Sequence, residues 1–118
     1  MFESEHRALL SDVSFTQRDS SGEVIATGTC DIADIDTNQS DAELTGNIAI
    51  TATVRRAQLF ADHLQWDNSN RTLYSDSEEV VKVVYDDQSV VRGVGFKGDF
   101  TLQDVTFQEI LEGKIQYE

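Results

Sequence analysis

The sequence of 118 residues contains no proline and a single cysteine, Cys30. Because proline cannot donate a hydrogen bond to a β-ladder, its absence permits long, uninterrupted strands. One cysteine excludes an internal disulfide framework, and a lone cysteine is usually a small buried hydrophobic residue. A chain of this length buries roughly two thirds of its unfolded surface. We therefore expect one domain whose core forms without a disulfide, a metal or a cofactor.

Basic residues are also scarce, with 9 Lys and Arg against 22 Asp and Glu and a formal net charge of -13. Such a charge repels polyanions, so we expect no nucleic-acid partner. It also argues against electrostatic attachment to an anionic membrane. No apolar run approaches the roughly 18 residues of a membrane span, and no signal-peptide core follows Met1. Either the protein is cytosolic, or a targeting segment is missing from the sequence.

Motifs that would indicate catalysis are missing as well. His6 and His63 are the only histidines, and neither lies in a zinc-protease motif, near Cys30 or beside a nucleophile elbow. The spacing of Gly93, Gly95 and Gly98 imitates a dinucleotide fingerprint, but no helix is predicted after it to bind a pyrophosphate. We therefore predict no catalytic residue, no metal site and no enzyme activity.

Alternating apolar and polar positions are what the sequence does contain. Residues 1–8 are expected to be a disordered or lead segment, and residues 9–118 one domain. The first predicted strand spans 9–17, with Leu9, Val13 and Phe15 on one face, and a turn at 18–22 leads to a second strand that places Ile32 with its inward residues. A loop is predicted at 34–41 because of its Asp, Asn and Ser residues.

Strand patterns continue to the end of the chain. They are predicted at 44–54, 57–66, 72–75, 80–85, 90–100, 102–107 and 110–117, the last as a sheet edge. A β-bulge near Ala61 or Asp62 would place Leu59, Leu64 and Trp66 on one side. The 80–85 strand is apolar on both faces, so we expect it to be central and covered twice. No helical period is sustained, and roughly nine or ten antiparallel strands indicate a sandwich, a jelly roll or an open barrel.

One pattern in the chain occurs twice. Leu59, Leu64, Asp67 and Leu73 are followed 32 residues later by the equivalent positions Val91, Phe96, Asp99 and Val105. Each copy reads as strand, turn and strand, and repeated units usually stack to bury apolar faces that they cannot bury alone. We interpret each Asp as a turn residue that hydrogen bonds the backbone, in preference to a catalytic carboxylate.

The apolar strand positions allow two architectures. In a closed β sandwich they would fill the core, whereas two sheets parted along one side would line a trough for an apolar ligand. The residues expected to line such a trough are Phe15, Ile48, Ile50, Leu64, Trp66, Leu73, Val83, Tyr85, Phe96, Phe100, Val105 and Phe107.

Several stretches resemble the LptC component of lipopolysaccharide export and the related LptA and OstA-like domains. They are LFADHLQWD at 59–67, RTLYSD at 71–76, the pair Val80 and Val83, VRGVGFKGD at 91–99, the glycine-flanked 22–28 stretch and LTGNI at 44–48. The resemblance covers about residues 9 to 117. It implies a twisted, open β jelly roll whose two sheets form a V-shaped hydrophobic groove, with no cofactor.

The resemblance also implies a role and partners. LptC-like proteins take lipopolysaccharide from an inner-membrane ABC transporter and pass it to an LptA-like groove protein. They are periplasmic and usually begin with a transmembrane helix, which this sequence lacks. Open sheet edges can be completed by a partner's strand, so we expect docking through Leu9, Val13, Leu111, Ile115 and Tyr117. Because the chain is so acidic, we expect the ligand to be either lipopolysaccharide itself or a related, less anionic glycolipid. A closed carbohydrate-binding or structural sandwich is the alternative function.

Overall fold

The computed structural model describes residues 7–53, 56–99, 102 and 105–114, most of which lie in nine β-strands. The strands are β1 (Arg7–Arg18), β2 (Val24–Asp36), β3 (Asp41–Ala52), β4 (Ala57–Asp67), β5 (Thr72–Tyr74), β6 (Val80–Val84), β7 (Val90–Val94), β8 (Lys97–Gly98) and β9 (Glu109–Lys114). All pairings are antiparallel, and the sheet is open. The predicted all-β class is confirmed. The described residues form no helix, and hence none long and apolar enough to cross a membrane.

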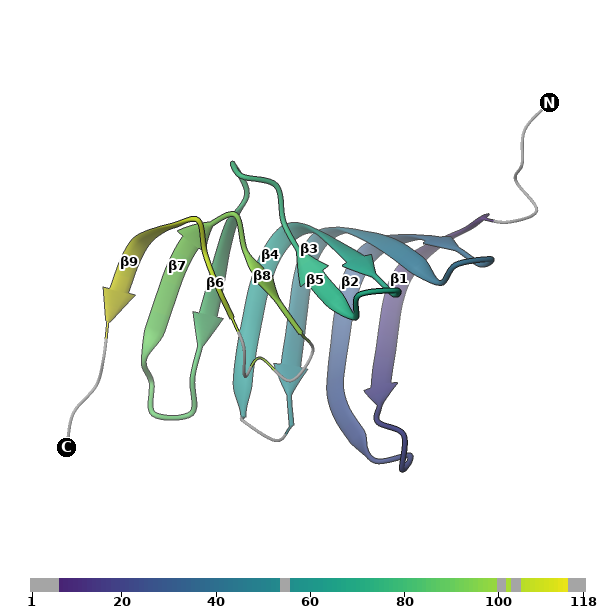
Figure 1. The fold of residues 1–118 in the computed structure, drawn as a ribbon, viewed down its shortest axis with the longest axis horizontal. Coiled ribbons are helices and arrows are strands. Elements are labelled where there is room, and N and C mark those ends of the chain that lie inside the picture. Colours follow the sequence, from purple (N-terminus) through teal and green to yellow (C-terminus); the bar gives the residue numbers. More distant parts are fainter. Residues whose placement is uncertain (1–6, 54–55, 100–101, 103–104, 115–118) are drawn as a thin grey trace.

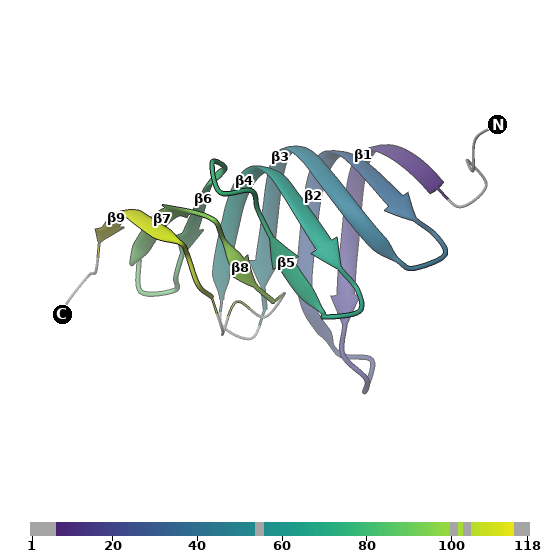
Figure 2. The ribbon, with the colours of Figure 1, turned by 45° about the horizontal axis from the view of Figure 1, so that its top comes forward.

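The strands form two layers of one hydrogen-bonded sheet. The strand order is β1-β2-β3-β4-β6-β7-β9. Outside this order, β5 pairs with the C-terminal end of β4, and β8 pairs with β5. The long strands β1 to β4 bend over near their middle, which brings β5 and β8 in front of the rear parts of β2, β3 and β4 (Figures 1 and 2). The front layer consists of β5, β8 and the parts of β1 to β4 on the same side of the bend. The rear layer consists of β6, β7 and the remaining parts of β1 to β4. The two sheets expected from the sequence are therefore the two layers of a single bent sheet.

The bend follows a line of irregular residues across β1 to β4, which we call the crease: Asp12, Asp31, Gly46, Asn47 and Asp62. None of them takes part in the regular ladders between these strands. Positive φ angles occur at Asp12 (53°), Gly46 (86°) and Asn47 (48°), a region that glycine and asparagine tolerate best. The Asn47 side-chain amide donates to Asp31 Oδ2 over 2.9 Å, which joins β3 to β2 at the bend.

The segment between β5 and β6 crosses from the front layer to the rear layer beside the crease. Its Glu79 carboxylate accepts hydrogen bonds from the backbone N–H groups of Asp62 (2.9 Å) and His63 (3.1 Å). Both residues lie in the gap between the β4–β6 ladder, which ends at Phe60, and the β4–β5 ladder, which begins at Gln65. The carboxylate therefore satisfies backbone donors that the bend leaves without a strand partner.

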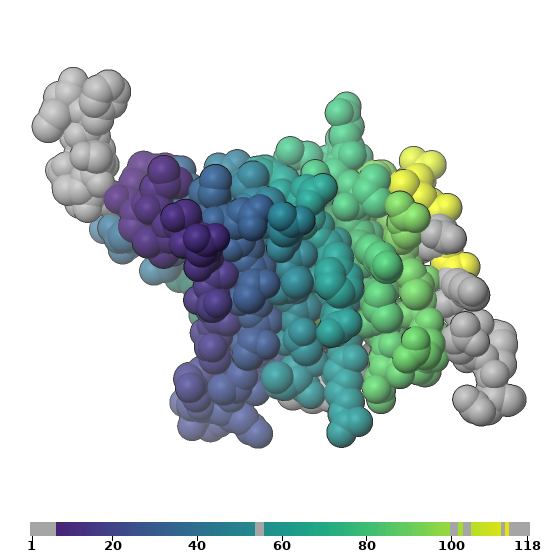
Figure 3. All heavy atoms as spheres, turned by 180° about the vertical axis from the view of Figure 1, so that it is seen from behind, coloured from purple at the N-terminus to yellow at the C-terminus, as the bar shows by residue number. Residues whose placement is uncertain are grey.

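The core lies between the two layers. Its buried members are Ala26, Cys30, Ala33, Leu44, Ile48, Ile50, Ala52, Ala57, Leu59, Leu64, Leu73, Val81, Val83, Phe96 and Leu102. Cys30 is buried among them, as the composition indicated. Seen from behind, the rear layer presents a continuous surface from β1 to β7 (Figure 3).

The predicted change of inward face within β4 is confirmed, although the extra residue of the irregularity lies in β3, where Gly46 and Asn47 both stand opposite Asp62. Two predicted strand faces are wrong. Leu59 and Leu64 are both fully buried although five residues separate them, because the ladder is irregular around Asp62. In β1 and β2 the crease reverses the alternation in the same way. Leu9 is 74% exposed and Ile32 is 43% exposed, so neither shares the inward face that simple alternation predicted.

Three further expectations need correction. β1 begins at Arg7, inside the expected lead segment, and the Arg7 guanidinium forms a 2.6 Å salt bridge with Asp34. The predicted loop at 34–41 is shorter, since β2 continues to Asp36 and β3 begins at Asp41. β6 is central in the strand order but covered on one face only, because Val81 is fully buried whereas Val80 is 40% exposed.

The chain beyond β8 closes one end of the space between the layers. Leu102 is buried in the core, and the Phe107 ring packs against Phe96 with 5.6 Å between ring centroids. A Cβ atom at Gly93 would lie 2.6 Å from the Glu109 carbonyl oxygen and 2.7 Å from Phe107 Cδ1. Gly93 is therefore required for the close approach of the segment that follows β8.

Candidate functional site

An apolar slot of about 220 Å3 lies between the two layers beside β1, at the end that Leu102 does not close. The rear layer contributes Val13, Phe15 and Gln17 of β1, and the front layer contributes residues of β2, β3 and β4. The full lining is Val13, Phe15, Gln17, Ala33, Ile35, Ser40, Ala42, Leu44 and Trp66. The slot is thus the open end of the space between the two layers, and core residues fill the rest of that space.

The slot depends on the crease for its apolar lining. Beyond the crease, Ile35 and Ala42 lie directly opposite each other in the β2–β3 ladder, and Ala42 lies opposite Trp66 in the β3–β4 ladder. Directly opposed residues share a face of the sheet, so these three side chains form one row across the front layer. Facing this row, Phe15 lies against Gly28, where any Cβ atom would overlap the Phe15 ring.

The residues predicted to line a groove divide into two groups. Six are fully buried in the core with at most 1% exposure, namely Ile48, Ile50, Leu64, Leu73, Val83 and Phe96. Five are half-buried and pack against the core, namely Phe15, Trp66, Tyr85, Val105 and Phe107. Phe100 lies outside the described residues. Of the predicted set, Phe15 and Trp66 line the slot, and the structure brings them together from β1 and β4.

Sequence reasoning missed most of the slot. Ile35 and Ala42 were assigned to a loop or its border, although Ile35 continues an alternation that begins at Ala33. Val13 was assigned to a docking edge, yet its side chain lines the slot. The signal that could have identified these residues is the resumption of alternation after a polar interruption at Asp31.

The residues predicted for docking lie at the two ends of the described strand order. β1 forms one end and β9 the other. Leu9 on β1 is 74% exposed, and Leu111 on β9 is 52% exposed beside Ile110 at 61%. Ile115 and Tyr117 lie outside the described residues. The described part of the chain therefore has two terminal strands that carry large exposed apolar side chains.

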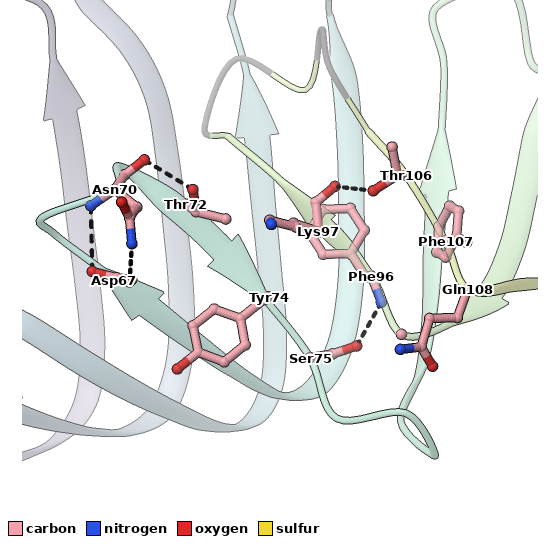
Figure 4. A pocket seen from close by; sticks show the side chains of 11 residues that line it. Asp67, Asn70, Thr72, Tyr74, Ser75, Phe96, Lys97, Thr106, Phe107 and Gln108 are labelled. Atoms are coloured by element: carbon pink, nitrogen blue, oxygen red, sulfur yellow. Dashed lines mark hydrogen bonds between the residues drawn. The ribbon is translucent and has the colours of Figure 1, made fainter.

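A larger hollow, of about 700 Å3, lies over β5 and β8 (Figure 4). Its lining is mostly polar, and its hydrogen bonds maintain the local fold. Ser75 Oγ accepts from the backbone N–H of Phe96 over 2.9 Å, and Thr106 Oγ1 donates to the Lys97 carbonyl. We regard the smaller slot as the candidate site, because its lining is apolar and opens toward a sheet edge.

Charged groups near the front-layer turns are engaged in local structure. The Asp67 carboxylate accepts from Ser69 and Asn70, and its pKa is lowered by the Asn70 side-chain hydrogen bond. The pKa of Asp19 is lowered in the same way, first by the Ser21 hydroxyl. Burial raises the pKa of the Cys30 thiol, so this group stays protonated and unreactive near neutral pH. These carboxylates are turn residues, as predicted for Asp67 from the repeated pattern.

The described residues contain no group of three or more His, Cys, Asp and Glu side chains arranged to hold a metal ion. His63 Nε2 lies 2.5 Å from Glu43 Oε2, and His63 Nδ1 lies 4.0 Å from Asp76 Oδ2, so this histidine links β4, β3 and the segment after β5. The arrangement connects strands at the crease and lies apart from the slot lining.

Comparison with known proteins gave no match: no family model matches this sequence, and no curated protein does either.

Proposed function

We propose that this protein carries a glycolipid, shielding its acyl chains between the two layers of the sheet, in the manner of LptC-like proteins. The single observation that supports the proposal is the apolar slot between the layers beside β1, which is lined by Phe15, Ile35 and Trp66. Shielding one methylene group from water is worth about 0.8 kcal/mol. A slot of this kind binds a chain without chemical reaction, so the direction of transfer has to come from partners.

Bridging is the second part of the proposal. Both terminal strands, β1 and β9, can be extended by a partner's strand, because edge strands offer unpaired backbone groups. In the proposed assembly, β1 faces an inner-membrane ABC transporter and β9 docks an LptA-like groove protein in the periplasm. The stretches resembling LptC at 59–67, 71–76 and 91–99 support this assignment. They include Leu64, Leu73 and Phe96, which are buried between the layers.

Trp66 provides a direct test of lipid binding because it is the only tryptophan of the chain and lines the slot. Glycolipids with brominated acyl chains should quench its fluorescence, whereas the same lipids without bromine should not. Ile35→Asp should abolish quenching, since a carboxylate in the slot opposes burial of a chain. Ile32→Asp is the matched control, because Ile32 lies on the same strand and is already 43% exposed. Equal quenching in both variants would exclude the slot.

Docking is tested separately by replacing Leu111, which is 52% exposed on β9. Leu111→Lys should abolish capture of an LptA-like partner in a pull-down while the circular dichroism spectrum of the variant stays native. Retained capture would refute the role of β9 and leave lipid binding unaffected.

The alternative is a closed structural or carbohydrate-binding sandwich. The observation that favours it is the complete burial of Leu73, Val83 and Phe96, which fill one half of the space between the layers. Under this alternative no brominated lipid quenches Trp66, whatever the residue at position 35.

A further inference from the structure

The side chain of Arg71 stacks on the ring of Trp66, one of the residues that line the apolar slot. The Arg71 guanidinium carbon is 5.8 Å from the centroid of the Trp66 ring, and the same ring lines the slot together with Ser40 and Ala42. Arg71 is exposed and belongs to the turn between β4 and β5. Within the described residues its guanidinium forms no salt bridge. Stacking on an aromatic face leaves the N–H groups at the edge of a guanidinium available to an anion.

Two carboxylates, those of Asp41 and Asp67, bind backbone amides of the turn that contains Arg71. Asp67 accepts from the amides of Ser69 and Asn70, and Asp41 Oδ1 accepts from the Asn68 amide over 2.8 Å. Each carboxylate therefore fixes a part of the turn that presents Arg71. The turn holds the cation beside the slot even though the chain as a whole carries a formal charge of -13.

The size of the slot limits what can enter it. Its volume of about 220 Å3 is smaller than the roughly 300–1,000 Å3 of pockets that enclose drug-sized ligands. One alkyl chain fits such a space, whereas several chains of one lipid do not. The polar side chains of Gln17 and Ser40 are the exceptions in an otherwise apolar lining.

We propose that the slot takes a single acyl or alkyl chain whose anionic head group, a phosphate or a carboxylate, is bound by Arg71 on the ring of Trp66. This inference rests on the proposed lipid-carrier function and specifies its ligand: one chain at a time, with the negative group next to the slot. Charge-assisted hydrogen bonds from a guanidinium to a phosphate are among the strong polar contacts in proteins.

The test compares three amphiphiles that share a dodecyl chain, namely dodecyl phosphate, dodecyl maltoside and dodecyltrimethylammonium, by calorimetric titration below their micelle concentrations. The native protein should bind dodecyl phosphate about tenfold or more tightly than dodecyl maltoside. Arg71→Gln should remove this preference and leave binding of dodecyl maltoside unchanged. The matched control is Arg56→Gln, because Arg56 is also an exposed arginine with a φ of 54° in a turn.

The possible results distinguish the role of Arg71 from the lipid-carrier function of the slot. Equal affinity for the phosphate and the maltoside, or a preference that survives Arg71→Gln, overturns the role of Arg71 and leaves the slot as a chain site. Tightest binding of the ammonium compound also overturns it. Inorganic phosphate that binds as tightly as dodecyl phosphate indicates an anion site that is independent of the slot and contradicts the inference. If no dodecyl compound binds, both the inference and the lipid-carrier function fail.

Discussion

The two ends of the space between the layers belong to the same sheet but differ in what fills them. At the β6 and β7 end, Leu102 and Phe107 fold back over Phe96 and close the space. At the β1 end, Phe15 and Trp66 face each other across the slot and remain half-buried. The comparison shows that closure depends on the segment after β8, and the sheet alone leaves an opening.

The largest expected difference between the two ends concerns their phenylalanines. Phe96→Ala should lower the free energy of unfolding by about 3–5 kcal/mol, because Phe96 is 1% exposed and its removal leaves a cavity. Phe15→Ala should cost about 1–2 kcal/mol, since its ring is half-buried at a slot that already contains space. Urea denaturation measures both values. Equal losses would mean that the two ends are packed alike.

Replacing glycines at the two ends tests the same difference in packing, and the expected losses of stability are smaller. Gly93→Ala should cost about 1–3 kcal/mol because the new Cβ atom meets the Glu109 carbonyl oxygen, a backbone atom, at 2.6 Å. Gly28→Ala should cost less, since the atoms nearest to its new Cβ belong to the Phe15 ring, which can turn into the slot. Gly113→Ala is the neutral control because nothing lies within 4 Å of a Cβ there. A larger loss for Gly28→Ala would contradict an open slot.

Between the two ends lies the crease, and replacing Glu79 tests how much its hydrogen bonds there contribute to the stability of the fold. Glu79→Gln keeps an acceptor for the amides of Asp62 and His63 but removes the charge, so we expect a loss of about 1 kcal/mol. Glu78→Gln is the control, because Glu78 is exposed in the same segment. Thermal unfolding followed by circular dichroism should separate the two variants. Identical melting temperatures would mean that the Glu79 carboxylate does not stabilise the bend.

The smallest effect is the pH dependence contributed by Asp67 in the turn at the open end. Hydrogen bonds from Asn70 and Ser69 lower its pKa in the folded state below the ordinary value of 3.8. The carboxylate therefore stabilises the fold above the unfolded-state pKa, and this contribution is lost as the pH falls through the folded-state pKa. Asp67→Asn should be less stable than the native protein at pH 7 and equally stable at the acidic end of the titration. A difference that does not change with pH would contradict this assignment.

The strands and several of their details could be predicted from the sequence. Period-two alternation is a local property, so it predicts strands such as β1, β3 and β4. It also predicts the change of inward face within β4, where the spacing of Leu59 and Leu64 departs from two. The repeat also has a structural counterpart. In each copy the chain passes from the rear layer, at Leu59 or Val91, to a buried front-layer residue, Leu64 or Phe96.

The crease and the slot could not be predicted because they arise from pairing between distant strands. Asp12, Asp31 and Asn47 each look like an ordinary polar residue within a strand, and only the ladders place them on one line. The faces of Leu9 and Ile32 were wrong for this reason. Burial of Leu73 and Phe96 was predicted as part of an apolar face, but whether that face is filled or open depends on Leu102, which no periodicity identifies.

The alignment of irregular residues across four strands has a consequence for how the sequence can change in length. Side chains alternate along a strand, so removing one residue near Asp12 would move every side chain on one side of the deletion to the opposite face of the sheet. Leu9 and Leu10 would then exchange the sides of the strand that they occupy, while the neighbouring strand kept its own orientation. Insertions and deletions should therefore be tolerated in the hairpin turns and rejected along this line, so the number of residues there matters as much as their identity.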